Sequence, residues 1–249
     1  MRPVYRNTDN RTQRNKLRKD YAMRYNIRIN EVKSDDSQIQ GFATVTFGDS
    51  IVVRNIAIIK KHDSDDLFVS MPSYRTNDVT EKGEPIYRDV CNPITKEFYE
   101  ELSKNILDAF NNRQTIGKNG LDIGEPSTEV AFTVKVTPLT REDSSLRGLG
   151  RIYLEDNFVI SNVKMIEGKN GMFISMPDYR TEKYKDGKPI YREIAFPITK
   201  EFREKLYGEF EKAYQEEKTK AISEEPAKKP TSKAKAKDKE PEKEPAVAR

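Results

Sequence analysis

One stretch of this sequence occurs twice, and the repetition decides how the chain is organised. Residues 68–76 read FVSMPSYRT and residues 173–181 read FISMPDYRT. After a short polar insert, both copies continue with Pro-Ile-Tyr-Arg and then with Pro-Ile-Thr-Lys-Glu-Phe. A match of this length and mixed composition is too specific to arise by chance, so the chain contains two copies of one domain.

The repeat divides the chain into five segments. We predict a disordered basic arm (1–24), a first domain (25–112), a linker (113–129), a second domain (130–214) and a disordered tail (215–249). The tail consists mainly of Lys, Glu, Ala and Pro and has too little apolar surface to fold. The arm carries eight basic and two acidic residues. It is either a solubilising leader or an arm that contacts nucleic acid.

Hydrophobic periodicity predicts the fold of each copy. Apolar residues alternate with polar ones at the start of each domain, and further β-rich runs end at the two Met-Pro pairs. The inserts 77–84 and 182–188 are polar and read as exposed loops. Each copy then ends in an amphipathic helix, capped by Thr95 or Thr199. The fold class is therefore α+β: two tandem small antiparallel sheets, each closed by a C-terminal helix.

The apolar stripe of each helix recurs at every fourth residue. This spacing is typical of a helix that covers a sheet, and a cofactor-binding interpretation is much weaker. The stripes consist of Phe98, Leu102, Ile106 and Phe110 in the first copy and of Phe202, Leu206, Phe210 and Tyr214 in the second.

The composition argues against several functions. One histidine, one cysteine and no phosphate-binding loop or nucleophile motif leave nothing to carry catalysis, so we expect no enzyme, no cofactor, no metal and no small-molecule substrate. The run His62–Asp66 lacks the glycine and glutamate of a calcium loop and reads as a solvated hairpin tip. Cys91 reads as a buried core residue. No membrane-spanning run and no secretory signal are visible, and we expect a cytoplasmic protein.

Four arginines are the strongest candidate site residues. Each falls at a loop edge beside a strand, and the planar guanidinium group suits phosphate or a guanine edge. The alternative is that they pair with neighbouring carboxylates such as Asp89 and Glu193 and have a structural role. The four are Arg75, Arg88, Arg180 and Arg192.

Tyrosines and lysines accompany these arginines. Tyr74 and Tyr179 precede the motif arginines and either stack on unpaired bases or belong to the core or an interface. Tyr87 and Tyr191 stand in the same relation to the second pair of arginines. Lys96 and Lys200 lie in the first turn of each helix, where they gain nothing from the helix dipole, and they suggest a basic face.

The residues around the repeated motif resemble the SpoVG (stage V sporulation protein G, septation protein) family. The resemblance covers about residues 25–112 and 130–214, and Met-Pro-x-x-Arg-Thr is its most specific element. It implies small bacterial domains, usually dimeric, that bind DNA and RNA and are connected with sporulation and septation in cell division. Members commonly have lysine where this chain has Tyr74 and Tyr179, and they have one domain where this chain has two.

Two hypotheses follow. The first is a cytoplasmic bacterial regulator that binds DNA or RNA, mainly through phosphate contacts, and whose copies form a pseudo-dimer within the chain or a homo-oligomer. The net charge of +4, from 45 basic and 41 acidic residues, supports it only weakly. The second is a protein-interaction scaffold that recruits a division or regulatory partner through its sheet edges.

Overall fold

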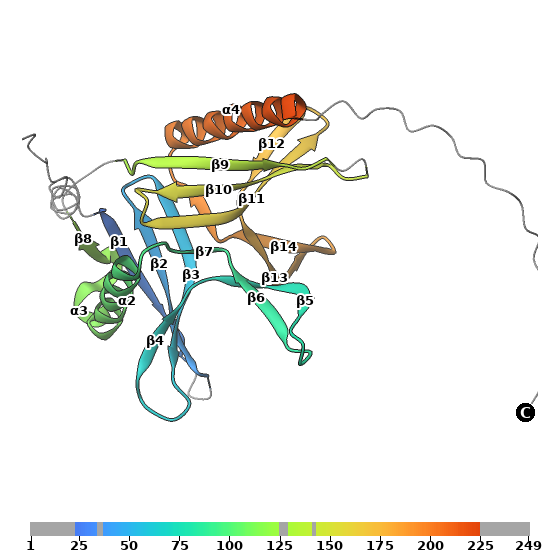
Figure 1. Ribbon diagram of the computed structural model, residues 1–249. Coiled ribbons are helices and arrows are strands. Elements are labelled where there is room, and N and C mark those ends of the chain that lie inside the picture. The colour runs from blue at the N-terminus through green and yellow to red at the C-terminus, as the bar shows by residue number, and fades with distance from the viewer. Residues whose placement is uncertain (1–22, 34–36, 125–128, 141–142, 225–249) are drawn as a thin grey trace, which may run out of the picture.

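The computed structural model describes residues 23–33, 37–124, 129–140 and 143–224 (Figure 1). Nearly all of the predicted basic arm, and the predicted tail from residue 225 onward, lie outside these residues. The described chain is α+β and its sheets are mainly antiparallel, as the sequence predicts. In the described residues, no helix is both long enough and apolar enough to span a bilayer.

The first copy begins with an antiparallel meander. Period-two alternation places Tyr25 and Ile27 in the core and leaves Arg28 and Asn30 exposed, and this pattern makes one strand face apolar. The elements of this copy are β1 (Tyr25–Glu31), β2 (Ile39–Phe47), β3 (Ile51–Lys60), β4 (Leu67–Ser70), β5 (Ser73–Val79), β6 (Pro85–Asp89), β7 (Cys91–Pro93) and α2 (Lys96–Asn111).

The second copy repeats this order. Phe132 stands opposite Leu154 in the β9–β10 pair just as Tyr25 stands opposite Phe47 in the β1–β2 pair, so equivalent positions can be matched through the strand registers. Its elements are β9 (Phe132–Pro138), β10 (Leu146–Leu154), β11 (Phe158–Gly168), β12 (Gly171–Ser175), β13 (Asp178–Lys185), β14 (Lys188–Glu193), β15 (Ala195–Pro197) and α4 (Lys200–Glu224).

Each copy donates one short strand to the sheet of the other. Strand β7 of the first copy pairs with β11, and β15 of the second copy pairs with β3. In each long strand an asparagine with positive φ, Asn55 or Asn162, separates the part that binds the exchanged strand from the part that pairs with β4 or β12. Asparagine adopts this backbone conformation more readily than most residues. The two copies therefore share one continuous apolar core.

The helices begin where the sequence predicts. Thr95 Oγ1 accepts a hydrogen bond from Phe98 N at 3.2 Å, and Thr199 Oγ1 accepts one from Phe202 N at 3.1 Å. All eight residues of the two predicted stripes are buried. Helix α2 packs against β1 and β4, and α4 packs along β9.

The two polar inserts are loops only in part: β5 extends to Val79 and β13 to Lys185, and only residues 80–84 and 186–187 lie outside the strands. Strands β5 and β6 pair with each other, as do β13 and β14, and each pair forms a two-stranded hairpin that is separate from the main sheets. Tight turns at Gly83 and Gly187, both with positive φ, connect the strands. Because neither face of such a hairpin is fully covered, its strands lack the apolar alternation that reveals a half-buried strand.

The linker and the start of the tail also contain structure that the sequence analysis missed. The linker forms α3 (Arg113–Ile116), the 3-10 helix η1 (Gly117–Asn119) and β8 (Leu121–Ile123), which pairs with the free edge of β1. Helix α4 continues past Tyr214 to Glu224, where an ion pair of 2.7 Å joins Lys220 to Glu217. Charged residues extend a helix that already has a packed start, even though they bury little themselves.

Candidate nucleic-acid interface

Each hairpin places two arginines opposite two tyrosines. Tyr74 stands across from Arg88, and Arg75 stands across from Tyr87. The second hairpin repeats this with Tyr179 across from Arg192 and Arg180 across from Tyr191. Because neighbouring residues of a strand point to opposite faces, each face of each hairpin presents one arginine and one tyrosine. The structure thus joins six of the predicted site residues in two equivalent Arg–Tyr hairpins.

The arginine side chains of the hairpins remain available. All four are exposed, and none forms an ion pair with Asp89, Glu193 or any other carboxylate in the described residues. Two of the facing tyrosines are exposed as well, Tyr87 to 59% and Tyr191 to 56%. Exposed guanidinium and phenol groups side by side offer a charge for phosphate and a ring for a base.

The two hairpins differ in how their tyrosines are packed. Tyr179 is half-buried against the core, whereas Tyr74 is 40% exposed. In the second hairpin, Arg180 donates a hydrogen bond to the hydroxyl of Tyr184, and its Cζ lies 5.5 Å from the centre of that ring. The first hairpin has Asp78 at the position of Lys183 and no tyrosine corresponding to Tyr184. Arg75 is therefore less restrained than Arg180.

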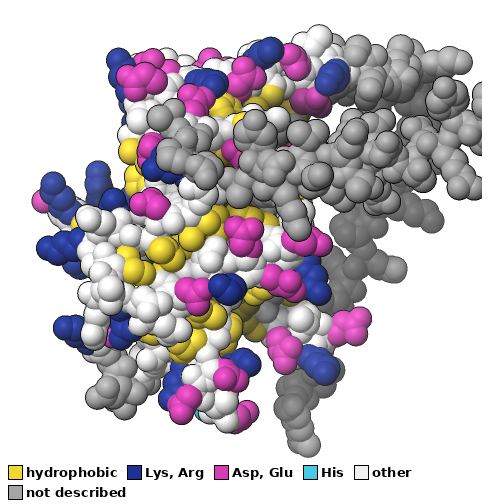
Figure 2. Space-filling model, turned by 90° about the vertical axis from the view of Figure 1, so that its left-hand side faces the viewer, with side chains coloured by type: hydrophobic (Ala, Val, Ile, Leu, Met, Phe, Trp, Pro, Cys, Tyr) yellow, Lys and Arg dark blue, Asp and Glu magenta, His cyan; other side chains and the backbone are white. Residues whose placement is uncertain are grey.

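Lys96 and Lys200 do not join the Arg–Tyr hairpins. Both lie in the first turns of α2 and α4, which stand apart from the hairpins in Figure 1. Their Nζ atoms lie 3.5 and 3.6 Å from carboxylates one turn along, those of Glu100 and Glu204. On the side of the molecule that Figure 2 shows, basic and acidic side chains are interspersed rather than gathered by sign.

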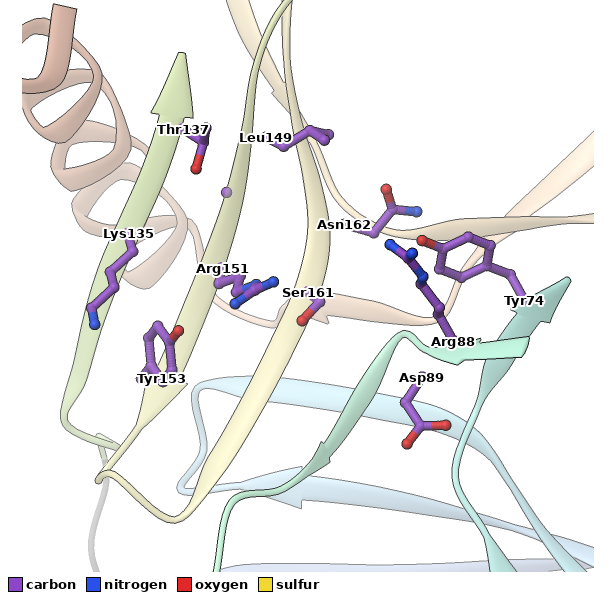
Figure 3. Close-up of a pocket in the computed structure, with 11 residues that line it drawn as sticks. Tyr74, Arg88, Asp89, Lys135, Thr137, Leu149, Arg151, Tyr153, Ser161 and Asn162 are labelled. Carbon is purple, nitrogen blue, oxygen red and sulfur yellow. The ribbon is translucent and has the colours of Figure 1, made fainter. Parts of the chain in front are cut away.

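The first hairpin borders a groove that the sequence analysis did not anticipate. The groove has a volume of about 410 Å³ and lies between the β5–β6 hairpin and the outer face of β9, β10 and β11 (Figure 3). Arg88 and Tyr74 project together from the hairpin toward Asn162, and Arg151 points into the same space from β10. Lys135 and Tyr153 complete its far end.

Lys135 and Arg151 lie at positions where their strands alternate from apolar to polar residues. Lys135 lies between buried or half-buried Val134 and Val136, and Arg151 lies between buried Gly150 and Ile152. The alternation thus indicated that Lys135 and Arg151 face away from the core. Sequence alone gave no sign that a hairpin from the other copy lies over them, because that placement results from the exchange of β7.

Two other sequence features were placed as follows. The His62–Asp66 run lies in the exposed turn between β3 and β4, where Asp65 pairs with Lys60 at 2.5 Å and Asp66 pairs with Lys61 at 3.4 Å. Cys91 is fully buried in β7, as predicted, and burial raises the pKa of its thiol far above the ordinary value.

Comparison with known proteins identifies both halves with the same family. The SpoVG family matches residues 23–112 and 130–216. A protein of Clostridium acetobutylicum is 35% identical over 96 residues, which are 37% of this chain and 95% of the relative. One of Lachnospira eligens is 38% identical over 82 residues, 33% of this chain and 86% of the relative. Both carry the name "Putative septation protein SpoVG".

Proposed function

Because this chain belongs to the SpoVG family, with one family domain in each half, we propose that it is a non-enzymatic cytoplasmic regulator that binds DNA or RNA in connection with septation or sporulation. The observation that carries the proposal is the pair of Arg–Tyr hairpins whose arginines form no ion pair within the described residues. Leaving such groups exposed adds little to the stability of the fold, and it fits a surface that awaits an anionic partner.

The exchange of β7 and β15 supports a pseudo-dimer formed within one chain. It gives the molecule two hairpins in a fixed relation, so two contacts with one polyanion add without the entropic cost of bringing two chains together. The binding energy then comes mainly from phosphate contacts, and the affinity decreases steeply with salt.

The test is fluorescence anisotropy with labelled DNA and RNA oligomers at several salt concentrations. We expect Arg75→Ala with Arg180→Ala to weaken binding by about 2–6 kcal/mol, at about 1–3 kcal/mol for each bidentate contact. Lys96→Ala with Lys200→Ala is the matched control, because it removes the same charge from ion-paired positions on the helices. Equal losses in both double variants would show that total charge, and not the hairpins, determines binding. Removal of residues 1–22 tests separately whether the arm contributes to the salt dependence; Met23 and Arg24 are kept, because Met23 is buried in the core and Arg24 O accepts a hydrogen bond from Gly48 N.

A second candidate is a protein-interaction scaffold, and the edge of β9 favours it. In the first copy, β8 covers the equivalent edge of β1, whereas β9 pairs only with β10 among the described strands. A groove of about 480 Å³ runs between β9 and α4, with Phe132 and Val134 in its lining. An extended peptide can add to such an edge. If the chain binds no oligomer even at low salt, this candidate replaces the first.

A further inference from the structure

The groove beside the first hairpin combines three kinds of chemical group. Arg88, Lys135 and Arg151 supply positive charge from three different strands. Tyr74 and Tyr153 supply aromatic rings, and Lys135 Nζ lies 5.2 Å from the centre of the Tyr153 ring. Asp89 and Asn162 add hydrogen-bonding groups. No carboxylate of the described residues forms an ion pair with any of the three cations.

This set of groups matches an unpaired nucleotide better than a duplex. A base offers its flat face and its hydrogen-bonding edge only when it is neither paired nor stacked within a helix. The cations suit the phosphates on either side of the base, and the Asp89 carboxylate can accept a hydrogen bond from a base amino group. A volume of about 410 Å³ is sufficient for a small ligand but far too small for a double helix.

The equivalent face of the first-copy sheet carries different residues. By strand register, the first-copy sheet has Thr44 and Thr46 where the second-copy sheet has Arg151 and Tyr153. Ser161 corresponds to Arg54, whose guanidinium lies 4.2 Å from the centre of the Phe196 ring on the exchanged strand. The first-copy face therefore lacks counterparts of Arg151 and Tyr153, although the exposed Arg28 stands at the position of Lys135. Arg54, which this face has in place of Ser161, already packs on the Phe196 ring.

We propose that the groove between the β5–β6 hairpin and the second-copy sheet binds unpaired nucleotides of a single-stranded DNA or RNA, one stretch per chain. The proposal rests on the proposed function, because it assigns the strandedness and the place of the same nucleic-acid binding. The second hairpin then contributes phosphate contacts without holding a base.

The test exchanges residues between the two copies in the full-length chain. Arg151→Thr with Tyr153→Thr gives the groove the residues of the other sheet, where threonine is already accommodated. Anisotropy is measured with a labelled single strand of about 12 nucleotides and with the matching duplex. We expect the exchange to weaken single-strand binding at least about tenfold, since stacking of one base contributes on the order of 1–3 kcal/mol, and to change duplex binding much less.

Arg88→Ala and Arg192→Ala provide the matched comparison, since they occupy equivalent hairpin positions. The groove requires that Arg88→Ala weaken single-strand binding more than Arg192→Ala. Equal effects of these two substitutions would overturn the groove while leaving the proposed function intact. So would wild-type affinity of the Arg151→Thr, Tyr153→Thr double variant with an unchanged thermal midpoint. Displacement of the strand by micromolar adenosine monophosphate would show instead that the groove takes free nucleotides. Failure of the wild type to bind any oligomer would remove the proposed function itself.

Discussion

The two copies build the same backbone from different side chains, and the differences fall into two groups. Residues that hold the backbone are repeated: Asn55 and Asn162 have φ values of 63° and 61°, and both helices have a threonine cap. Residues that fill the core or face outward differ between the copies: the first copy has Thr44 where the second has Arg151. The comparison teaches that the strands passed between the copies, and the hairpins, belong to the fold itself, whereas Arg151 and Tyr153 of the groove occur in the second copy only.

Core residues also differ between the two copies, but the summed volume of residues in contact is kept nearly the same. In the second copy, the ring of Phe210 lies against Gly150 so closely that a Cβ at Gly150 would be 2.3 Å from a ring carbon. The corresponding residues of the first copy are Ala43 and Ile106, which are both fully buried. A larger strand residue is thus matched by a smaller helix residue, as close packing requires.

The largest expected effect concerns whether the two copies are separate units at all. Leu102 and Leu206 are equivalent and fully buried, so Leu102→Ala and Leu206→Ala are each expected to lower the free energy of unfolding by about 2–5 kcal/mol. Because β7 and β15 tie the two sheets together, each variant is expected to unfold in one transition. Urea unfolding followed by circular dichroism and by tyrosine fluorescence tests this. Two resolved transitions in either variant would mean that the copies unfold independently.

The next prediction concerns the close packing of Gly150 against the ring of Phe210. Gly150→Ala places a methyl group against the Phe210 ring and is expected to cost about 1–3 kcal/mol of stability. Adding Phe210→Ile recreates the first-copy combination, and part of the loss is expected to return. The coupling is measured as a double-mutant cycle in urea. Additive losses would show that the two positions do not compensate each other.

Sequence reasoning recovered the parts of this molecule that have a periodic signal. The family, the longer strands of the main sheets (β1–β4 and β9–β12) and the two capped helices follow from the repeat, the alternation and the four-residue stripes, and the family is confirmed. The extension of β5 and β13 into the inserts, and their pairing with β6 and β14, were missed because most of these residues are exposed on both faces, so no alternation marks them. Strand β8 was missed because three residues are too few to show a period.

The candidate site was recovered in part for a similar reason. The Arg and Tyr residues of the repeated motif were visible as a local pattern, and the structure places them on common hairpins. Lys135, Arg151 and Tyr153 meet Arg88 only because a three-residue strand crosses from one copy to the other. Such a long-range placement depends on the pairing of whole sheets, and no local pattern encodes it.

A smaller effect is expected from one titratable difference between the cores. Tyr25 is fully buried where the second copy has Phe132, and its hydroxyl donates a hydrogen bond to Glu101 Oε1 at 3.1 Å and accepts one from Asn105 Nδ2 at 2.8 Å. Burial raises the pKa of Tyr25 well above its ordinary value of 10.0, and the carboxylate of Glu101 adds to the increase, while the Asn105 hydrogen bond opposes it.

The raised pKa of Tyr25 makes the stability of the fold decrease at alkaline pH. Below about pH 10 the tyrosine is neutral in both the folded and the unfolded chain, and its contribution to stability is complete. Above this pH the unfolded chain loses the proton first, so stability falls by at most about 1.4 kcal/mol per pH unit from this group. Urea unfolding between neutral and alkaline pH is expected to show a shallower decline for Tyr25→Phe than for the wild type. Parallel curves would mean that Tyr25 titrates normally in the folded state.

The smallest effect concerns the exchanged strands. Phe196 of β15 packs against the guanidinium of Arg54. At the equivalent place the residues are Asn92 of β7 and Ser161 of β11, so the β7–β11 pair has no such contact between a cation and a ring. A cation over an aromatic ring at a partly exposed site contributes about 0.5–1 kcal/mol. Phe196→Leu keeps most of the apolar area and removes the ring's charge distribution, so a cycle with Arg54→Gln isolates the interaction. A coupling near that value would show that the fold holds Arg54 against Phe196, which makes Arg54 less available to a phosphate. A coupling of zero would mean that Phe196 does not restrain Arg54. Arg54 would then be as available to a phosphate as Arg151, and the two sheet faces would differ less than a comparison of Thr44 and Thr46 with Arg151 and Tyr153 suggests.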